Sequence, residues 1–124
     1  MVEAPATLEA SLHARKPVSV RVLTGSMAPT VLAGATVTAR AGKPALGDVV
    51  LVRSPDGFTL HRLIARLGPR WVHAGDAPGS GAGLCRARDV LAVAELPRRV
   101  PGRRARALAI LDALARSVRS RLRV

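Results

Sequence analysis

The sequence predicts a mainly β domain followed by a basic amphipathic helix. Between Pro17 and Pro97, short runs alternate apolar and polar residues and are separated by Gly and Pro, which is typical of a small barrel or of packed sheets. After Gly102 the apolar residues recur every three or four positions, which is the period of a helix. The chain has 124 residues, which is room for one domain, and 48% of them are hydrophobic, which is enough for a core.

The predicted strands follow one another closely along the chain. They cover residues 18–23, 35–39, 48–53, 58–67, 71–73 and 89–96. Residues 1–16 mix small, polar and charged types and predict a short helix or a frayed arm. Residues 75–83 contain four glycines and a proline, and we expect a loop there. The chain therefore divides into an N-terminal arm (1–16), a β core (17–97) and an Arg-rich helix (98–124).

Positive charge is concentrated at the C-terminal end. The formal net charge of the chain is +12, and residues 98–124 contain nine arginines against one acid, Asp112. Such an excess usually indicates nucleic acid or an anionic membrane surface as a partner. Only 2% of the residues are aromatic, which argues against recognition through stacked aromatic side chains. The polyanion argument therefore applies to the helix and not to the β core.

The predicted helix has one apolar face, which allows three interpretations. The face is formed by Leu108, Leu111, Ala115, Val118 and Leu122. In the simplest interpretation the helix packs on the sheet through this face and its arginines are solvated. In the second, the helix docks on an anionic membrane surface, and the contacts come from Arg103, Arg104, Arg116 and Arg119. In the third, it binds nucleic acid or an acidic protein.

Several classes of site lack their signature. The single cysteine, Cys85, excludes an internal disulfide and a zinc site built from cysteines. No segment approaches the ~18 apolar residues that a membrane span needs, and no dinucleotide-binding or phosphate-loop pattern is present. We therefore expect no cofactor, no metal and a cytoplasmic location, with peripheral contact at the inner face of the membrane as the only membrane association.

Three residues have side chains suited to nucleophilic catalysis. Ser26 lies in a Gly-Ser-Met-x-Pro turn directly after a predicted strand, where a short side chain is exposed at the rim of a sheet. Its hydroxyl needs a base to remove the proton, and His61 is suited to that task because a histidine titrates near neutral pH. Asp76 begins the glycine-rich loop and has the chemistry to orient and stabilise a histidine.

Each of these residues also has an ordinary structural explanation. A Gly-Ser turn is often only a turn, a histidine on a strand is often structural, and Gly-Asp commonly begins a loop. His73 is a competing base, but its place on a predicted strand favours a structural role. Cys85 has no accompanying base segment that would activate it, and His13 is assigned no role.

Several segments, taken together, resemble the signal peptidase and repressor-cleaving peptidase superfamily. Thr24–Thr30 looks like its nucleophile segment, and Gly47–Val52 is similar to its Gly-Asp-Val-Val strand. His61–Ile64 resembles the segment with the general base, in the His-Arg form of archaeal and eukaryotic signal peptidases. Gly75–Ala77 matches the third segment, and Val90–Ala92 fits the strand that closes the domain. The segments occur in the order that the family has.

The resemblance implies a catalytic core built on a coiled β-ribbon, and hydrolysis of peptide bonds through an acyl-enzyme on Ser26. His61 matches the general base of the family. The hydroxyl of Thr24 and the backbone N–H of Ser26 would form the oxyanion hole, where losing one donor typically costs about 100-fold in rate or more. Met27 is expected to pack beneath the turn.

The sequence departs from the family at two points. The third segment of the family usually has a second acid six residues after the aspartate, and that position is Ala82 here. Either Asp76 then orients His61 itself, or the enzyme works with a Ser–His dyad. The sequence also contains neither a membrane anchor nor the large insert of longer members.

The leading hypothesis is a serine endopeptidase that processes a specific precursor protein or peptide. The alternative within the family is a degenerate module that binds a peptide or a partner without cutting it, which Ala82 would explain. A nucleic-acid-binding protein that acts through the Arg-rich helix is the hypothesis from a different class, and nucleic acid is the less favoured partner.

Overall fold

The computed structural model describes residues 1–122, apart from the side chain of Leu122. The protein is mainly β, as predicted, with a closed barrel and a C-terminal helix. The elements of the described residues are, in chain order, β1 (Val2–Glu3), α1 (Leu8–His13), β2 (Val18–Val22), β3 (Thr36–Arg40), β4 (Val49–Ser54), β5 (Gly57–Leu67), β6 (Arg70–Ala74), β7 (Ala82–Arg86), the 3₁₀ turn η1 (Ala87–Asp89), β8 (Val90–Ala94) and α2 (Arg103–Leu122).

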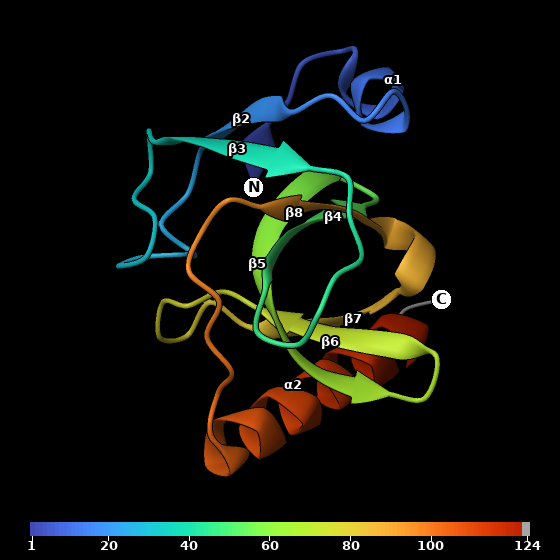
Figure 1. Cartoon of the computed structure of the whole chain (residues 1–124). Coiled ribbons are helices and arrows are strands. Elements are labelled where there is room, and N and C mark those ends of the chain that lie inside the picture. Colours follow the sequence, from blue (N-terminus) through green and yellow to red (C-terminus); the bar gives the residue numbers. More distant parts are fainter. Residues whose placement is uncertain (123–124) are drawn as a thin grey trace.

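Within this part of the chain, six strands form a closed barrel. Hydrogen-bonded neighbours follow the order β1-β2-β3-β8-β4-β5, and each of these pairs is antiparallel. The pairing of Val2 with Phe58 joins β1 to β5 and closes the ring. Strands β6 and β7 continue the sheet beyond β5. Helix α2 lies against them, and α1 lies at the other end of the molecule (Figure 1).

Strand β5 belongs to both parts of the sheet. Residues 57–62 pair with β4 in the barrel, and residues 62–67 pair with β6 in the extension. A bulge follows Leu63 in the pairing with β6. Bulges bend a strand and change the direction of its side chains, and His61 and Arg62 lie directly before this one.

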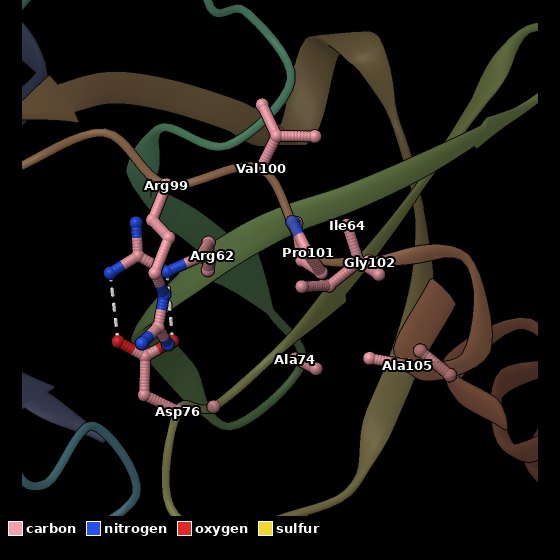
Figure 2. A pocket seen from close by; sticks show the side chains of 11 residues that line it. Arg62, Ile64, Ala74, Asp76, Arg99, Val100, Pro101, Gly102 and Ala105 are labelled. Atoms are coloured by element: carbon pink, nitrogen blue, oxygen red, sulfur yellow. Dashed lines mark hydrogen bonds and ion pairs between the residues drawn. The ribbon is translucent and has the colours of Figure 1, made fainter. Parts of the chain in front are cut away.

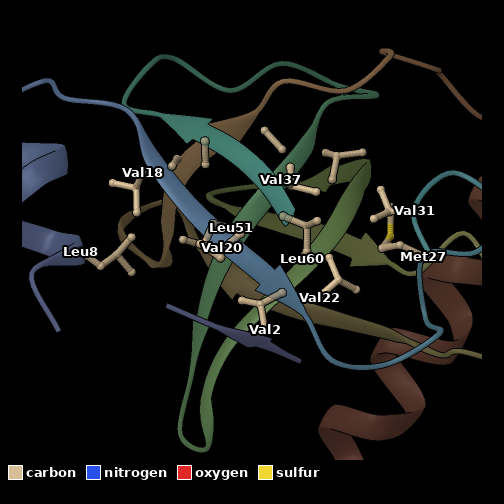
Figure 3. Packing of buried hydrophobic residues seen from close by; sticks show 14 of the residues in the cluster. Val2, Leu8, Val18, Val20, Val22, Met27, Val31, Val37, Leu51 and Leu60 are labelled. Carbon is tan, nitrogen blue, oxygen red and sulfur yellow. The ribbon is translucent and has the colours of Figure 1, made fainter. Parts of the chain in front are cut away.

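The barrel is filled with aliphatic side chains, as the scarcity of aromatic residues requires. The predicted alternation of the first long strand is confirmed in β2, where Val18, Val20 and Val22 are buried and the residues between them are exposed. Figure 3 shows these valines packed with side chains of neighbouring strands and with Leu8 of α1. Burying such a side chain fully contributes about 1.5–3 kcal/mol, so this cluster is the main hydrophobic core.

Helix α2 packs on the sheet, but through a different face from the predicted one. Its packed side is formed by the small or aliphatic residues Ala109, Ile110 and Ala113, which contact the apolar side chains of β5, β6 and β7. Small side chains allow a helix to approach a sheet closely, and Ala113 is only 1% exposed. The expectation that the leucine face covers the sheet is therefore wrong.

The predicted apolar face of α2 is turned toward solvent. Leu108 is 62% exposed, Leu111 64% and Val118 54%, and Ala115 is exposed as well. The side chain of Leu122, the fifth residue assigned to this face, lies outside the described residues.

Two of the described strands have no clear signal in the sequence. Strand β1 has two residues, too few to establish an alternation, and it lies in the region expected to be a helix or an arm. Strand β7 begins at Ala82, inside the region 75–83 that the sequence predicts as a loop. The sequence does not indicate this strand because Ala82 and Gly83 have low strand propensity. No helix in residues 1–122 is long and apolar enough to cross a membrane.

Candidate active site

Ser26 lies in the turn that follows β2, and the next residue anchors this turn in the core. The side chain of Met27 is fully buried and packs with Val31 in the barrel cluster, as expected. The N–H of Val31 donates to the carbonyl of Met27 (3.0 Å), which closes the turn. Ser26 itself is half-buried, and its Oγ accepts a hydrogen bond from the hydroxyl of Thr24 (3.4 Å).

The third family-like segment packs directly on the Ser26 turn. The N–H of Ala77 donates to the carbonyl oxygen of Ser26 (3.0 Å). A Cβ atom on Gly75 would overlap this carbonyl oxygen and the side chain of Ser80, so only glycine fits there. Two segments that are distant in the sequence are therefore held together at the residue proposed as the nucleophile.

A buried ion pair joins Asp76 to Arg62 of β5 (Figure 2). Arg62 Nε donates to Asp76 Oδ1 and Nη2 to Oδ2, each at 2.8 Å, and the two side chains are only 2% and 3% exposed. Arg62 Nη1 donates to the carbonyls of Gly47 (2.8 Å) and Pro97 (3.0 Å). Thr30 Oγ1 donates to Asp76 Oδ2 (2.5 Å), so the turn that follows Ser26 belongs to the same network.

Asp76 therefore holds Arg62 and does not orient His61. Among residues 1–122, the hydrogen bonds of its carboxylate come from Arg62 and Thr30, and Arg99 lies at ion-pair distance (3.6 Å). Burial alone would raise the pKa of Asp76, but these hydrogen bonds and the two arginine charges outweigh it and lower the pKa below its ordinary value. Asp76 acts on His61 only through its charge, which favours the protonated imidazole.

His73 is the partner of His61. The two Nδ1 atoms lie 2.8 Å apart, so one ring donates its proton and the other accepts it. The rings are tilted by 44° with their centroids at 5.0 Å. His73 also explains the glycine in β7, because a Cβ atom on Gly83 would lie 3.0 Å from the His73 ring. The sequence indicated His73 only as a competing base, since the pairing of β5 with β6 that brings it to His61 is a long-range contact.

Both histidines are neutral over a wide pH range. Burial, together with the charges of His73 and of the Met1 amino group, lowers the pKa of His61 to about 3, although the charge of Asp76 opposes this shift. Burial lowers the pKa of His73 to about 4. A neutral imidazole has one nitrogen free to accept a proton, which is the form that a general base requires.

Strand β1 runs along β2 and reaches Thr24, two residues before Ser26. The N–H of Leu23 donates to the carbonyl of Met1 (3.0 Å), and the Met1 amino group donates to Thr24 Oγ1 (3.2 Å). The positive charge of this amino group is one of the causes of the low pKa of His61. Within the described residues, no hydrogen bond joins Ser26 to His61, the two predicted catalytic residues.

Ala82, the position of the missing acid, is buried and belongs to the contact with α2. Its N–H donates to Asp112 Oδ2 at 2.8 Å. Cys85 is buried in β7, and burial raises the pKa of its thiol to about 11, so it is neutral and a poor nucleophile. Residues 1–122 contain no cluster of three or more His, Cys, Asp or Glu side chains that could hold a metal ion.

A cavity of about 430 Å³ lies between β5, β6 and the segment that leads into α2 (Figure 2). Ile64, Val100 and Pro101 line its apolar part, and the Arg62–Asp76 pair lies at one end. In the described part of the chain, neither Ser26 nor His61 lines it. The cavity is therefore separate from the predicted nucleophile and base.

Comparison of the chain with protein-family models, with curated proteins and with solved structures gave no match.

Proposed function

We propose that the protein is a serine endopeptidase that processes a specific precursor protein or peptide, with Ser26 as the nucleophile and His61 as the general base. One observation carries the proposal. The family-like segments are far apart in the sequence but meet around Ser26, through the Ala77–Ser26 hydrogen bond and through the Arg62–Asp76 pair next to His61. A chain without this chemistry would have no need to assemble these residue types at one turn.

In the proposed reaction, His61 removes the proton of the Ser26 hydroxyl as Oγ attacks the carbonyl carbon of the scissile peptide bond. The negative charge that develops on the carbonyl oxygen is stabilised by the Ser26 N–H and the Thr24 hydroxyl. The tetrahedral intermediate collapses to an acyl-enzyme, and the proton on His61 passes to the leaving amine. Water, deprotonated by the same histidine, then hydrolyses the ester and restores Ser26.

His73 would select the tautomer of His61 that this reaction needs. If Nδ1–H of His61 donates to Nδ1 of His73, the Nε2 atom of His61 carries the free lone pair. In this arrangement His73 takes the orienting role expected of Asp76, and it is a positioning residue. A neutral histidine stabilises an imidazolium less than a carboxylate does, so slow turnover is expected.

Strand β1 must leave its position before a substrate can reach Ser26. An extended peptide that binds next to β2 needs the backbone groups that β1 now uses, including the Leu23 N–H. Displacing Met1 would also remove a positive charge near His61, which would raise the pKa of the base. Substrate binding and activation of His61 are thus coupled in this proposal.

The second candidate function is a module of the same kind that binds a peptide without cutting it. Two observations favour it: among residues 1–122 no hydrogen bond joins His61 to Ser26, and the pKa of about 3 makes His61 a weak base. For location, we propose the cytoplasm, with peripheral contact at the inner face of the membrane.

The experiment compares the N-termini of all proteins in host cells that carry the wild-type protein or Ser26→Ala. New N-termini that occur only with the wild type support the peptidase and reveal its substrate and cleavage rule. Ser19→Ala is the matched control, because Ser19 is an exposed serine on β2, and it should behave as the wild type. Identical N-termini for wild type and Ser26→Ala, with both proteins folded and expressed, would favour the module that does not cut.

A further inference from the structure

Helix α2 presents an apolar surface to solvent, which we call the outer face. It is formed by Leu108, Leu111, Leu114 and Val118, which are 62%, 64%, 44% and 54% exposed. These residues recur at steps of three and four, so they form one continuous stripe along the helix. Contiguous exposed apolar surface of this kind usually marks a binding surface.

The outer face cannot turn inward, because the opposite side of α2 is fixed on the sheet. Ala113 is buried among side chains of β5, β6 and β7, with Ala109 and Ile110 beside it. The carboxylate of Asp112 accepts a hydrogen bond from the N–H of Ala82 at 2.8 Å. The stripe is therefore a permanent feature of the surface of the folded protein.

The charge around the outer face is positive. Between Arg103 and Leu122 the helix contains six arginines and a single acid, Asp112. That acid is directed toward the body of the protein, where it bonds Ala82 and Arg116. Arg116 lies over Gly81 and belongs to the same contact. The helical period places exposed Arg104 within the apolar stripe and exposed Arg103, Arg119 and Arg121 at its edges.

We propose that the outer face of α2 docks on an anionic lipid bilayer, with the helix axis in the plane of the surface. An apolar stripe bordered by arginines fits the boundary between acyl chains and headgroups, where the leucines enter the apolar layer and the guanidinium groups meet lipid phosphates. The leucines distinguish this partner from nucleic acid, which is bound through cations on phosphates. A second copy of the chain would bring two arginine-rich faces together and repel them.

Docking would bring the candidate active site close to the lipid surface. Leu108 lines a shallow cavity together with Gly75 and Ala77, and these two residues flank Asp76 and contact the Ser26 turn. The docking itself does not depend on the proposed peptidase activity, so the two proposals can fail separately.

The test is cosedimentation of the full chain with vesicles of phosphatidylcholine alone or with one quarter phosphatidylglycerol. We expect binding to the anionic vesicles, little binding to the neutral ones, and a loss of binding as salt is raised. The triple variant Leu108→Gln/Leu111→Gln/Val118→Gln should bind anionic vesicles at least tenfold more weakly. Leu32→Gln is the matched control, because Leu32 is 63% exposed on a loop far from α2 in the chain, and it should bind as the wild type.

Two charge variants separate lipid docking from the other partners. Arg104→Gln/Arg119→Gln should weaken vesicle binding and reduce its dependence on salt, and Arg21→Gln/Arg86→Gln, at exposed positions on the sheet, should change it less. Unchanged vesicle binding by the triple leucine variant, with its fold verified by circular dichroism, would overturn the proposal. The proposal would also be overturned if the wild type did not bind anionic vesicles but bound duplex DNA, or formed a dimer that Leu111→Gln dissociates.

Discussion

The proton between His61 and His73 determines which nitrogen of His61 can act as a base. Asparagine at position 73 could still accept this proton through its side-chain carbonyl, whereas leucine could not. We therefore expect His73→Leu to lose about 100-fold or more in kcat/KM, since a histidine in the wrong tautomer is a poor base. His73→Asn should stay within about tenfold of the wild type. The measurement is steady-state kinetics on the precursor identified from the new N-termini.

A purely structural role for His73 would give a different pattern. In that case the two variants would lose activity in proportion to their loss of thermal stability, and the pH profile would keep its shape. With the positioning role, the acid limb of kcat/KM follows the pKa of His61, which lies well below 6.5 in the folded protein. Equal activity of His73→Leu and wild type would remove His73 from the mechanism.

The sequence predicted the residue types of the candidate site better than their partners. Thr24, Ser26 and the Gly75-Asp76 segment lie together at one turn, because Gly75 leaves room for the carbonyl of Ser26, and their catalytic roles stay predictions. Of the two alternatives for Asp76, the one in which it orients His61 does not agree with the structure. Asp76 binds Arg62, the residue after His61, and neighbouring residues on a strand point to opposite faces. Which strand passes next to which is a long-range property that a single sequence does not contain.

Strand β1 occupies the strand position next to β2, beside Thr24. Removal of residues 1–3 should raise the rate of cleavage of a short peptide several-fold, because the peptide no longer competes with β1 for the Leu23 N–H. The same deletion should lower the free energy of unfolding by about 1.5–3 kcal/mol, since Val2 leaves the core. Peptide cleavage and urea denaturation measure the two effects.

Val2→Ala is the matched control for the deletion. It removes most of the buried side chain of Val2 but keeps the backbone of β1 in place. It should therefore lose stability without any gain in rate. A deletion variant that stays folded and cleaves no faster than the wild type would contradict the role of β1 as an obstacle.

The elements themselves were predictable where periodicity is strong. Strand β2 has the expected alternation and α2 has the expected helical period. The predicted buried face of α2 is wrong, because the prediction places the larger apolar side chains against the sheet. The alanines at 109 and 113 gain more from close approach to the sheet, and the bond from Ala82 to Asp112 fixes that side inward. An apolar stripe in a sequence thus indicates a face without stating which partner covers it.

The stability of the whole domain should depend on pH through its two buried histidines. Their pKa values are about 3 for His61 and about 4 for His73 in the folded protein, against about 6.5 in an unfolded chain. Between these values the unfolded chain binds more protons, so acid favours unfolding. The free energy of unfolding should fall as the pH drops below about 6.5, by up to about 1.4 kcal/mol per pH unit for each histidine. Urea denaturation at pH 7 and pH 5 measures the loss.

The variant His61→Gln/His73→Gln should lose most of this pH dependence. His13→Gln removes an exposed histidine on α1 and should keep it. If the free energy of unfolding of the double variant fell between pH 7 and pH 5 as much as that of the wild type, the loss of stability in acid would have to come from other groups.

The network around Arg62 also determines when the candidate site can exist during synthesis. Arg62 binds the carbonyl of Pro97, 35 positions later, and Thr30 binds Asp76 across 46 positions. Contacts between such distant positions form late in folding, because a long loop must close first. A nascent chain that has left the ribosome only as far as β7 still lacks Pro97 and β8, the strand between β3 and β4. The Arg62–Asp76 network beside His61 is therefore complete only when Pro97 and β8 have been synthesised, so the candidate site as a whole exists only in the finished domain.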